Sequence, residues 1–118
     1  MNVGEDAITS NSSGGITVIN IEGYDADDKL FQVSAASTLN VADCIIHRAG
    51  KGAAPEWRHH VPYRCHIDQC DINSMDEGVF RTDSFSSTPR LTNSRLHDAG
   101  VVCIGSWARG TQSGNTSY

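Results

Sequence analysis

Four cysteines in a chain of 118 residues, at positions 44, 65, 70 and 103, constrain this sequence more than any other feature. Short chains with an even number of cysteines are typical of extracellular domains in which disulfides supplement a thin core. Apolar residues make up only 38% of the chain, which fits such a core. The pairing stays open: we favour Cys44–Cys65 with Cys70–Cys103 over Cys44–Cys103 with Cys65–Cys70. On the chain-entropy model each bond contributes about 3–4 kcal/mol.

A metal site is the alternative interpretation of the central cysteines, because thiolates and imidazoles bind zinc. The residues of these types that lie close together are His59, His60, Cys65, His66 and Cys70. The Cys-x4-Cys spacing is at the wide end for zinc ligands, and no second compact pair follows it. We therefore expect neither a metal nor another cofactor.

Short runs of β-branched and aromatic residues between turn residues predict an all-β domain. The predicted strands are Ile16–Ile21, Leu30–Ala35, Asp43–His47, Gly78–Thr82, Arg90–Arg95 and Val101–Trp107. No window has the period of an amphipathic helix. We expect a small disulfide-stapled β-sandwich or barrel of six to seven strands over residues 16–107, with an α+β fold as the alternative. Residues 1–15 and 108–118 are polar, and we expect a flexible leader and a flexible tail there.

The charge of the chain argues against two classes of partner. A net charge of −5 and a pI of 5.3 disfavour binding to nucleic acid and to anionic membranes. No apolar run approaches the ~18 residues that a membrane span requires. The first residues resemble no signal peptide. The four cysteines nevertheless suggest an oxidising compartment, so we expect a mature secreted, extracellular domain, with a cytosolic protein with free thiols as the alternative. Sequons at Asn11 and Asn115 predict glycosylation.

A long irregular loop is predicted over residues 48–63, which contain two prolines and two glycines. Long loops in compact domains often carry function, and aromatic and arginine side chains are common interface anchors. The candidate partner-binding residues are Trp57, Arg58, His59, His60 and Tyr63. Trp57 as a plug of one open end of a barrel is an equal alternative.

No complete catalytic motif is present. The sequence has no Gly-x-Ser-x-Gly and no phosphate-binding glycine loop, and we interpret Asp25–Asp28 as a hairpin turn. A secreted ribonuclease-like fold, active or degenerate, is the runner-up: Glu77 as base, His97 as acid and Arg81 or Arg95 on the phosphate. A third possibility is an immunoglobulin-like domain, which would require a Cys44–Cys103 bond. The missing motifs favour a protein that binds a partner without catalysis.

Three features together resemble the small secreted fungal proteins related to the Alternaria major allergen. They are the strand Ile16–Asn20 with its returning strand Leu30–Val33, the series Cys44, Trp57 and Cys65, and the pair Phe80–Phe85 and Leu91–Asn93. The resemblance covers residues 16–107. It implies a β-barrel or sandwich without enzymatic activity that acts as an allergen, or as a fungal effector, elicitor or virulence factor toward a plant host. The implied partner is a host protein or a cell-wall component, bound by a monomer or weak dimer.

Overall fold

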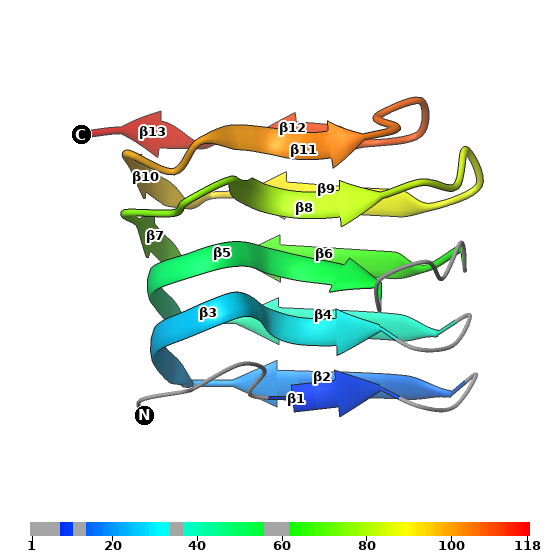
Figure 1. Ribbon diagram of the computed structural model, residues 1–118, viewed down its shortest axis with the longest axis horizontal. Coiled ribbons are helices and arrows are strands. Elements are labelled where there is room, and N and C mark those ends of the chain that lie inside the picture. Colours follow the sequence, from blue (N-terminus) through cyan, green and yellow to red (C-terminus); the bar gives the residue numbers. More distant parts are fainter. Residues whose placement is uncertain (1–7, 11–13, 34–36, 56–61) are drawn as a thin grey trace.

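The computed structural model describes residues 8–10, 14–33, 37–55 and 62–118 (Figure 1). These residues form thirteen strands. In chain order they are β1 (Ile8–Ser10), β2 (Gly15–Ile19), β3 (Glu22–Val33), β4 (Thr38–Ala42), β5 (Ile45–Pro55), β6 (Arg64–Asp68), β7 (Asp71–Asn73), β8 (Gly78–Thr82), β9 (Thr88–Thr92), β10 (Arg95–His97), β11 (Val101–Gly105), β12 (Thr111–Ser113) and β13 (Thr116–Ser117). No helix among the described residues is long and apolar enough to span a membrane.

The strands wind into a stack of coils in which each coil lies on the one before it. Strands β2, β4, β6, β9 and β12 pair side by side in one sheet, which we call the back sheet. The remaining strands form the front sheet, in which the long strand β5 pairs with the long strand β3 on one side and with both β7 and β8 on the other. One coil, or rung, therefore runs from a back strand through a corner into the front sheet, as Figure 1 shows.

All strand pairs in the described part of the chain are parallel. The fold is a parallel β-solenoid of about four turns, and the prediction of a β-sandwich or barrel was wrong. The immunoglobulin-like alternative fails for the same reason. Alternation at period two marks a strand facing a core on one side, but it does not say whether the neighbouring strand is parallel or antiparallel.

The interior is filled by columns of equivalent residues from successive rungs. One column consists of Val18, Val41, Ile67 and Leu91, which are aligned in the register of the back sheet. The last three are almost completely buried. Fully burying one such side chain contributes roughly 1.5–3 kcal/mol, so the stacked columns supply much of the driving force for folding.

Part of the predicted long loop is a strand. Residues 48–55 belong to β5, although Gly50, Gly52 and Pro55 argued against a strand there. Gly52 is required by close packing, because a Cβ atom at this position would lie 2.7 Å from the carbonyl oxygen of Val79 on the next rung. The glycine is thus a feature of the stack rather than a sign of a loop.

The expected flexible tail also contains strands. Residues 111–113 form β12 beside β9, and residues 116–117 form β13 beside β10. The end of the described chain therefore begins a fifth rung instead of leaving the domain. Of the predicted leader, residues 8–10 pair with β3 as β1.

A corner of constant geometry follows each back strand. One residue there has a left-handed backbone: Asn20, Asp43, Gln69, Asn93 or Gly114. The residue after it enters a second column, made of Ile21, Cys44, Cys70, Ser94 and Asn115. Since Cys44 and Cys70 occupy this column on adjacent rungs, with Cα atoms 4.5 Å apart, they form the disulfide.

Both predicted cysteine pairings were therefore wrong. Cys65 lies in the back sheet and Cys103 in β11, and each is a free thiol. Their partners in the prediction, Cys44 and Cys70, are bonded to each other instead. The pairing follows from the rung repeat, which places residues 26 positions apart next to each other.

Candidate functional site

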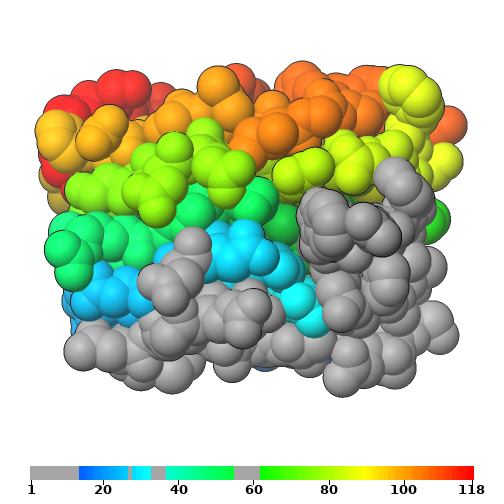
Figure 2. All heavy atoms as spheres, viewed as in Figure 1, coloured from blue at the N-terminus to red at the C-terminus, as the bar shows by residue number. Residues whose placement is uncertain are grey.

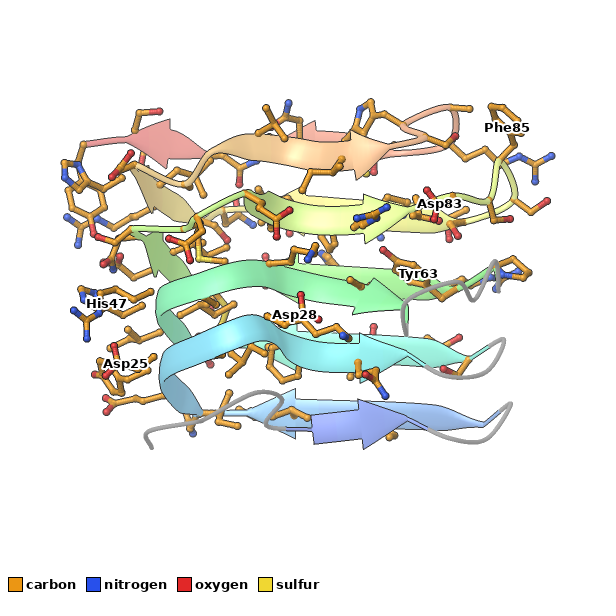
Figure 3. All side chains as sticks on the ribbon, viewed as in Figure 1. Asp25, Asp28, His47, Tyr63, Asp83 and Phe85 are labelled. Carbon is orange, nitrogen blue, oxygen red and sulfur yellow. A yellow bond between two sulfur atoms is a disulfide. The ribbon has the colours of Figure 1, made fainter. Side chains whose placement is uncertain are left out.

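A compact group of charged side chains lies on the front sheet, and we call it the front cluster: Asp28, Lys29, Lys51 and Glu77. Lys51 Nζ lies 2.6 Å from Asp28 Oδ1 and 2.8 Å from Glu77 Oε2. Lys29 Nζ lies 2.7 Å from Asp28 Oδ2. Two ammonium groups and two carboxylates are thus joined in one continuous network, with Asp28 near the middle of the view in Figure 3.

The parallel register brings these residues together from three rungs. Lys29 of β3 is aligned with Lys51 of β5, and Lys51 is aligned with Gly78 of β8. Glu77 directly precedes Gly78, and Asp28 directly precedes Lys29. Figure 2 shows the successive rungs as stacked bands of colour across this face.

Burial and pairing shift the pKa values of two members of the front cluster. Burial alone would raise the pKa of Asp28, but hydrogen bonds from Lys29 and Lys51 lower it below the ordinary value. Burial alone would lower the pKa of Lys51, but hydrogen bonds to Asp28 and Glu77 raise it. Asp28 is therefore a carboxylate, and Lys51 an ammonium group, at neutral pH.

The charged surface continues to the corner of the front sheet. The guanidinium of Arg48 on β5 forms an ion pair with Asp25 on β3. Asp25, Ala26, Arg48 and Asp76 line an open hollow of about 280 Å³. Asp25 stands at the left edge of the molecule in Figure 3. The front cluster thus has an adjoining depression in which a polar ligand could lie.

Among the described residues, no site contains the predicted partner-binding side chains. Trp57, Arg58, His59 and His60 lie outside the described residues, so their role stays a prediction. The structure corrects the expectation for Tyr63, whose side chain is in the core with 2% exposure. Its hydroxyl donates a hydrogen bond of 2.6 Å to the carbonyl oxygen of Arg81, so Tyr63 is no surface anchor.

The other candidate residues are separated from one another. Glu77 contacts Lys51, whereas His97 stacks on Tyr118 at the far end of the front sheet. Arg95 pairs with Asp71. These contacts do not form the base, acid and phosphate-binding set of a ribonuclease.

The described residues contain no group of three acidic, histidine or cysteine side chains that could hold a metal ion. Cys70 is in a disulfide, which removes it from the zinc alternative.

The predicted glycosylation sites have different outcomes. Asn11 lies outside the described residues. The side-chain amide of Asn115 accepts a hydrogen bond from the Ser94 backbone N–H (3.0 Å) and donates one to the Leu91 carbonyl oxygen (2.9 Å). This internal use of the amide disfavours attachment of a glycan, and glycosylation at both sites stays a prediction.

Lys29 and Lys51 were not among the predicted site residues, and Asp28 was assigned to a turn. One signal was available: Asp-Asp-Lys at 27–29 and Gly-Lys-Gly at 50–52 place lysines one rung apart. Recognising that signal requires the rung length, which the sequence does not display because successive rungs differ in length and in residue type.

Similarity to a known family identifies the chain more directly than the geometry of the site does. A family model described as pectate lyase matches residues 1–111. This match and the solenoid overturn the resemblance to the Alternaria allergen family, and they overturn the expectation of a protein without enzymatic activity, because the matched family is one of polysaccharide lyases. Pectate is a cell-wall polysaccharide, which agrees with the expected extracellular location and cell-wall partner. By the match over nearly its whole length, this chain belongs to the pectate lyase family.

Proposed function

We propose that this domain cleaves de-esterified pectin outside the cell by β-elimination, and that the front cluster carries out the reaction. The observation that carries the proposal is the network in which Lys51 joins carboxylates from two other rungs. The network combines ammonium groups that can bind the carboxylate of a uronate with carboxylates that can accept a proton. Family membership supplies the reaction class.

The reaction needs two kinds of group. A base removes the proton from C5 of a uronate residue, the electron pair of that C–H bond forms a C4=C5 double bond, and the C4–O4 bond breaks. The leaving oxygen takes up a proton, so no water is consumed. The C5 proton is acidic only if the negative charge that spreads into the neighbouring carboxylate is stabilised by cations in the transition state.

Lys29 and Lys51 supply the cations. Both side chains are largely buried, with exposed fractions of 5% for Lys29 and 9% for Lys51. A charge in such surroundings interacts more strongly with another charge than it does in water. The substrate carboxylate would approach their ammonium groups and share them with Asp28 and Glu77. Buried, fixed cations of this kind stabilise developing charge without reorganisation.

Glu77 is the better candidate for the base. Asp28 uses both carboxylate oxygens on the two lysines, and its lowered pKa makes it a weaker proton acceptor. Within the described residues, Glu77 uses only Oε2, on Lys51, and its side chain is 46% exposed. Its other oxygen can therefore face a substrate.

A divalent cation such as calcium could in principle bridge an acidic protein and an acidic polymer. Asp28 and Glu77 already bind lysine side chains, and Asp25 binds Arg48. These described residues therefore do not fit a preformed calcium cage, and no step is assigned to a metal ion.

The test follows formation of the unsaturated product from polygalacturonate by its ultraviolet absorbance. Lys51→Ala and Glu77→Gln should each lower kcat/KM by about a hundredfold or more, the usual effect of removing a charge-stabilising or proton-transferring group. Arg95→Ala is the matched control, because Arg95 is an exposed cation at the other end of the front sheet. It should keep wild-type activity.

Thermal unfolding of each variant separates loss of chemistry from loss of fold. Wild-type protein that forms no unsaturated product, or a folded Lys51→Ala variant with unchanged kcat/KM, would overturn the proposal.

A further inference from the structure

The outward surface of the back sheet carries a second group of polar side chains, which we call the back-face patch: Thr38, Asn40, Arg64, His66, Thr88 and Arg90. They come from three adjacent strands, β4, β6 and β9. Thr38, Arg64 and Thr88 are aligned in one row, and Asn40, His66 and Arg90 in the next. Their neighbours along each strand, such as Leu39 and Cys65, are buried in the core. The alternation therefore forces all six side chains to the same outer face.

The surface is hollowed at this patch. All six patch residues line a depression of about 170 Å³. A second open depression of about 350 Å³ is lined by Ser37, Thr38, Tyr63 and Arg64 among others. Because both include Thr38 and Arg64, the two hollows adjoin and form one shallow groove across the strands.

Two cations in this groove are available to a ligand. Arg64 and Arg90 are exposed and lie diagonally to each other on β6 and β9. Within the described residues neither guanidinium makes a hydrogen bond or ion pair; Arg90 has only a longer-range attraction to Asp68. A guanidinium carries a fork of N–H donors that matches a carboxylate. Two such forks on one face favour a ligand with repeated carboxylates.

His66 between them is held in one orientation by a chain of hydrogen bonds. Thr92 Oγ1 donates to Asp68 Oδ1 at 2.6 Å. A threonine hydroxyl has a single proton, so it must accept the 2.7 Å hydrogen bond that joins it to His66 Nε2. His66 Nε2 therefore carries a proton, and in the neutral ring Nδ1 is an acceptor.

Asp68 is kept ionised in this chain of contacts. The hydrogen bond from Thr92 lowers the pKa of Asp68, burial opposes it, and Asn93, which donates at 3.1 Å, lowers it further. An ionised Asp68 holds the Thr92 proton and so preserves the orientation of the imidazole. The patch thus presents two carboxylate-binding forks around an acceptor for a hydroxyl group.

We propose that the back-face patch is a second binding site for an anionic polysaccharide, separate from the front cluster. A uronic acid unit has the carboxylate and the hydroxyl groups that these side chains would recognise, and Asn40, Thr38 and Thr88 add further polar contacts. The occupant is a segment of polyuronate chain, selected by charge complementarity. The front and back sheets are different faces of the solenoid, so polymer can be held at the back while another segment reaches the front cluster.

The experiment measures the affinity of the full chain for polygalacturonate by affinity electrophoresis, which does not require cleavage. The double variant Arg64→Ser with Arg90→Ser should weaken binding at least about tenfold, since each replacement removes charge-assisted hydrogen bonds. Arg95→Ser, an exposed arginine outside the patch, should bind like wild type. His66→Gln should weaken binding less than the double variant.

A second readout separates this site from the proposed function. The double variant should cleave a short oligogalacturonate at the wild-type rate but insoluble pectate more slowly. Glu77→Gln should lose cleavage while keeping affinity for the polymer, because it removes the proposed proton acceptor but no cation. Unchanged affinity in the double variant would overturn the back-face site even if the enzyme is active. Equal retention of single-stranded DNA by the wild type would indicate a non-selective polyanion surface and would overturn it too.

Discussion

At the corner after each back strand, a left-handed residue turns the chain and the next side chain enters the interior. Four of the five left-handed positions carry Asn, Asp or Gln rather than glycine, namely Asn20, Asp43, Gln69 and Asn93. Asn and Asp tolerate this conformation better than other side chains because they bond to nearby backbone groups. Toward the C-terminal end, the interior column changes from the Cys44–Cys70 pair to the polar residues Ser94 and Asn115. These polar residues satisfy backbone groups that the corner leaves open.

The hydrogen bonds of Asn115 predict a stability cost for its removal. Asn115→Ala leaves the Ser94 N–H and the Leu91 carbonyl oxygen without these partners. Each unsatisfied buried group costs about 1–3 kcal/mol. The free energy of unfolding should therefore fall by about 1 kcal/mol or more. Urea titration measures it.

Thr111→Ala is the control for this prediction, because Thr111 lies on the same terminal rung and is exposed. A loss no larger than that of the control would show that the Asn115 contacts contribute little.

At the scale of strands, the different states of the four cysteines predict how the protein reacts with alkylating reagents. Cys65 is completely enclosed, which raises the pKa of its thiol well above the usual range, and burial raises the pKa of Cys103 to about 11. Since the thiolate is the reactive form, native protein should resist alkylation at neutral pH, with Cys103 reacting before Cys65. Peptide mapping of the alkylated protein should find two modified cysteines only after denaturation.

The same mapping tests the pairing. A Cys44–Cys70 peptide is expected, and replacing both by Ala should lower the free energy of unfolding by about 3 kcal/mol or somewhat more, because the bond closes a loop of 26 residues. A Cys44–Cys65 peptide would contradict the register of the corner column.

Several strands were predictable from their own residues, but their arrangement was not. Gly78–Thr82 was predicted with the bounds of β8, Ile16–Ile21 overlaps β2, and Val101–Trp107 contains β11. These segments are rich in β-branched residues, and that local preference survives in any sheet. β6 and β7 were missed because Arg64–Asp68 and Asp71–Asn73 are polar on their outer faces.

The site was less predictable than the strands. Asp28, Lys51 and Glu77 are far apart in the sequence and meet only through the parallel register. The residues next to each of them in the sequence suggest a turn or an exposed position, because the side chains that they contact belong to other rungs. Interpreting Asp25–Asp28 as a turn followed from this limit.

At the scale of the whole molecule, ion pairs connect rungs that hydrogen bonds already align. Lys51 on the second rung binds Asp28 of the first and Glu77 of the third. The network therefore couples the stability of three successive rungs to the charge of its members.

This coupling predicts a pH dependence of unfolding. Because the pKa of Asp28 is lowered in the folded state, its contribution is present above the ordinary value of about 3.9 and is lost as the pH falls through the folded value. Because the pKa of Lys51 is raised, its contribution is present below about 10.4 and is lost as the pH rises through the folded value. Urea midpoints measured across the pH range should fall at both ends.

Asp28→Asn should flatten the acid side of this profile, whereas Asp76→Asn, an exposed neighbouring acid, should leave its shape unchanged. An unaltered acid limb in Asp28→Asn would assign the loss to other carboxylates.

The one-rung register described for the front sheet also limits how such a chain can change length. In a solenoid each rung contacts only its neighbours, so gain or loss of one complete rung preserves the stack. A rung inserted between β3 and β5 would nevertheless separate Asp28 from Lys51 by one more strand spacing, and would break the network without unfolding anything. Duplication and deletion are thus tolerated outside the segment from Asp28 to Glu77, and within that segment the chemistry fixes a length that the architecture leaves open.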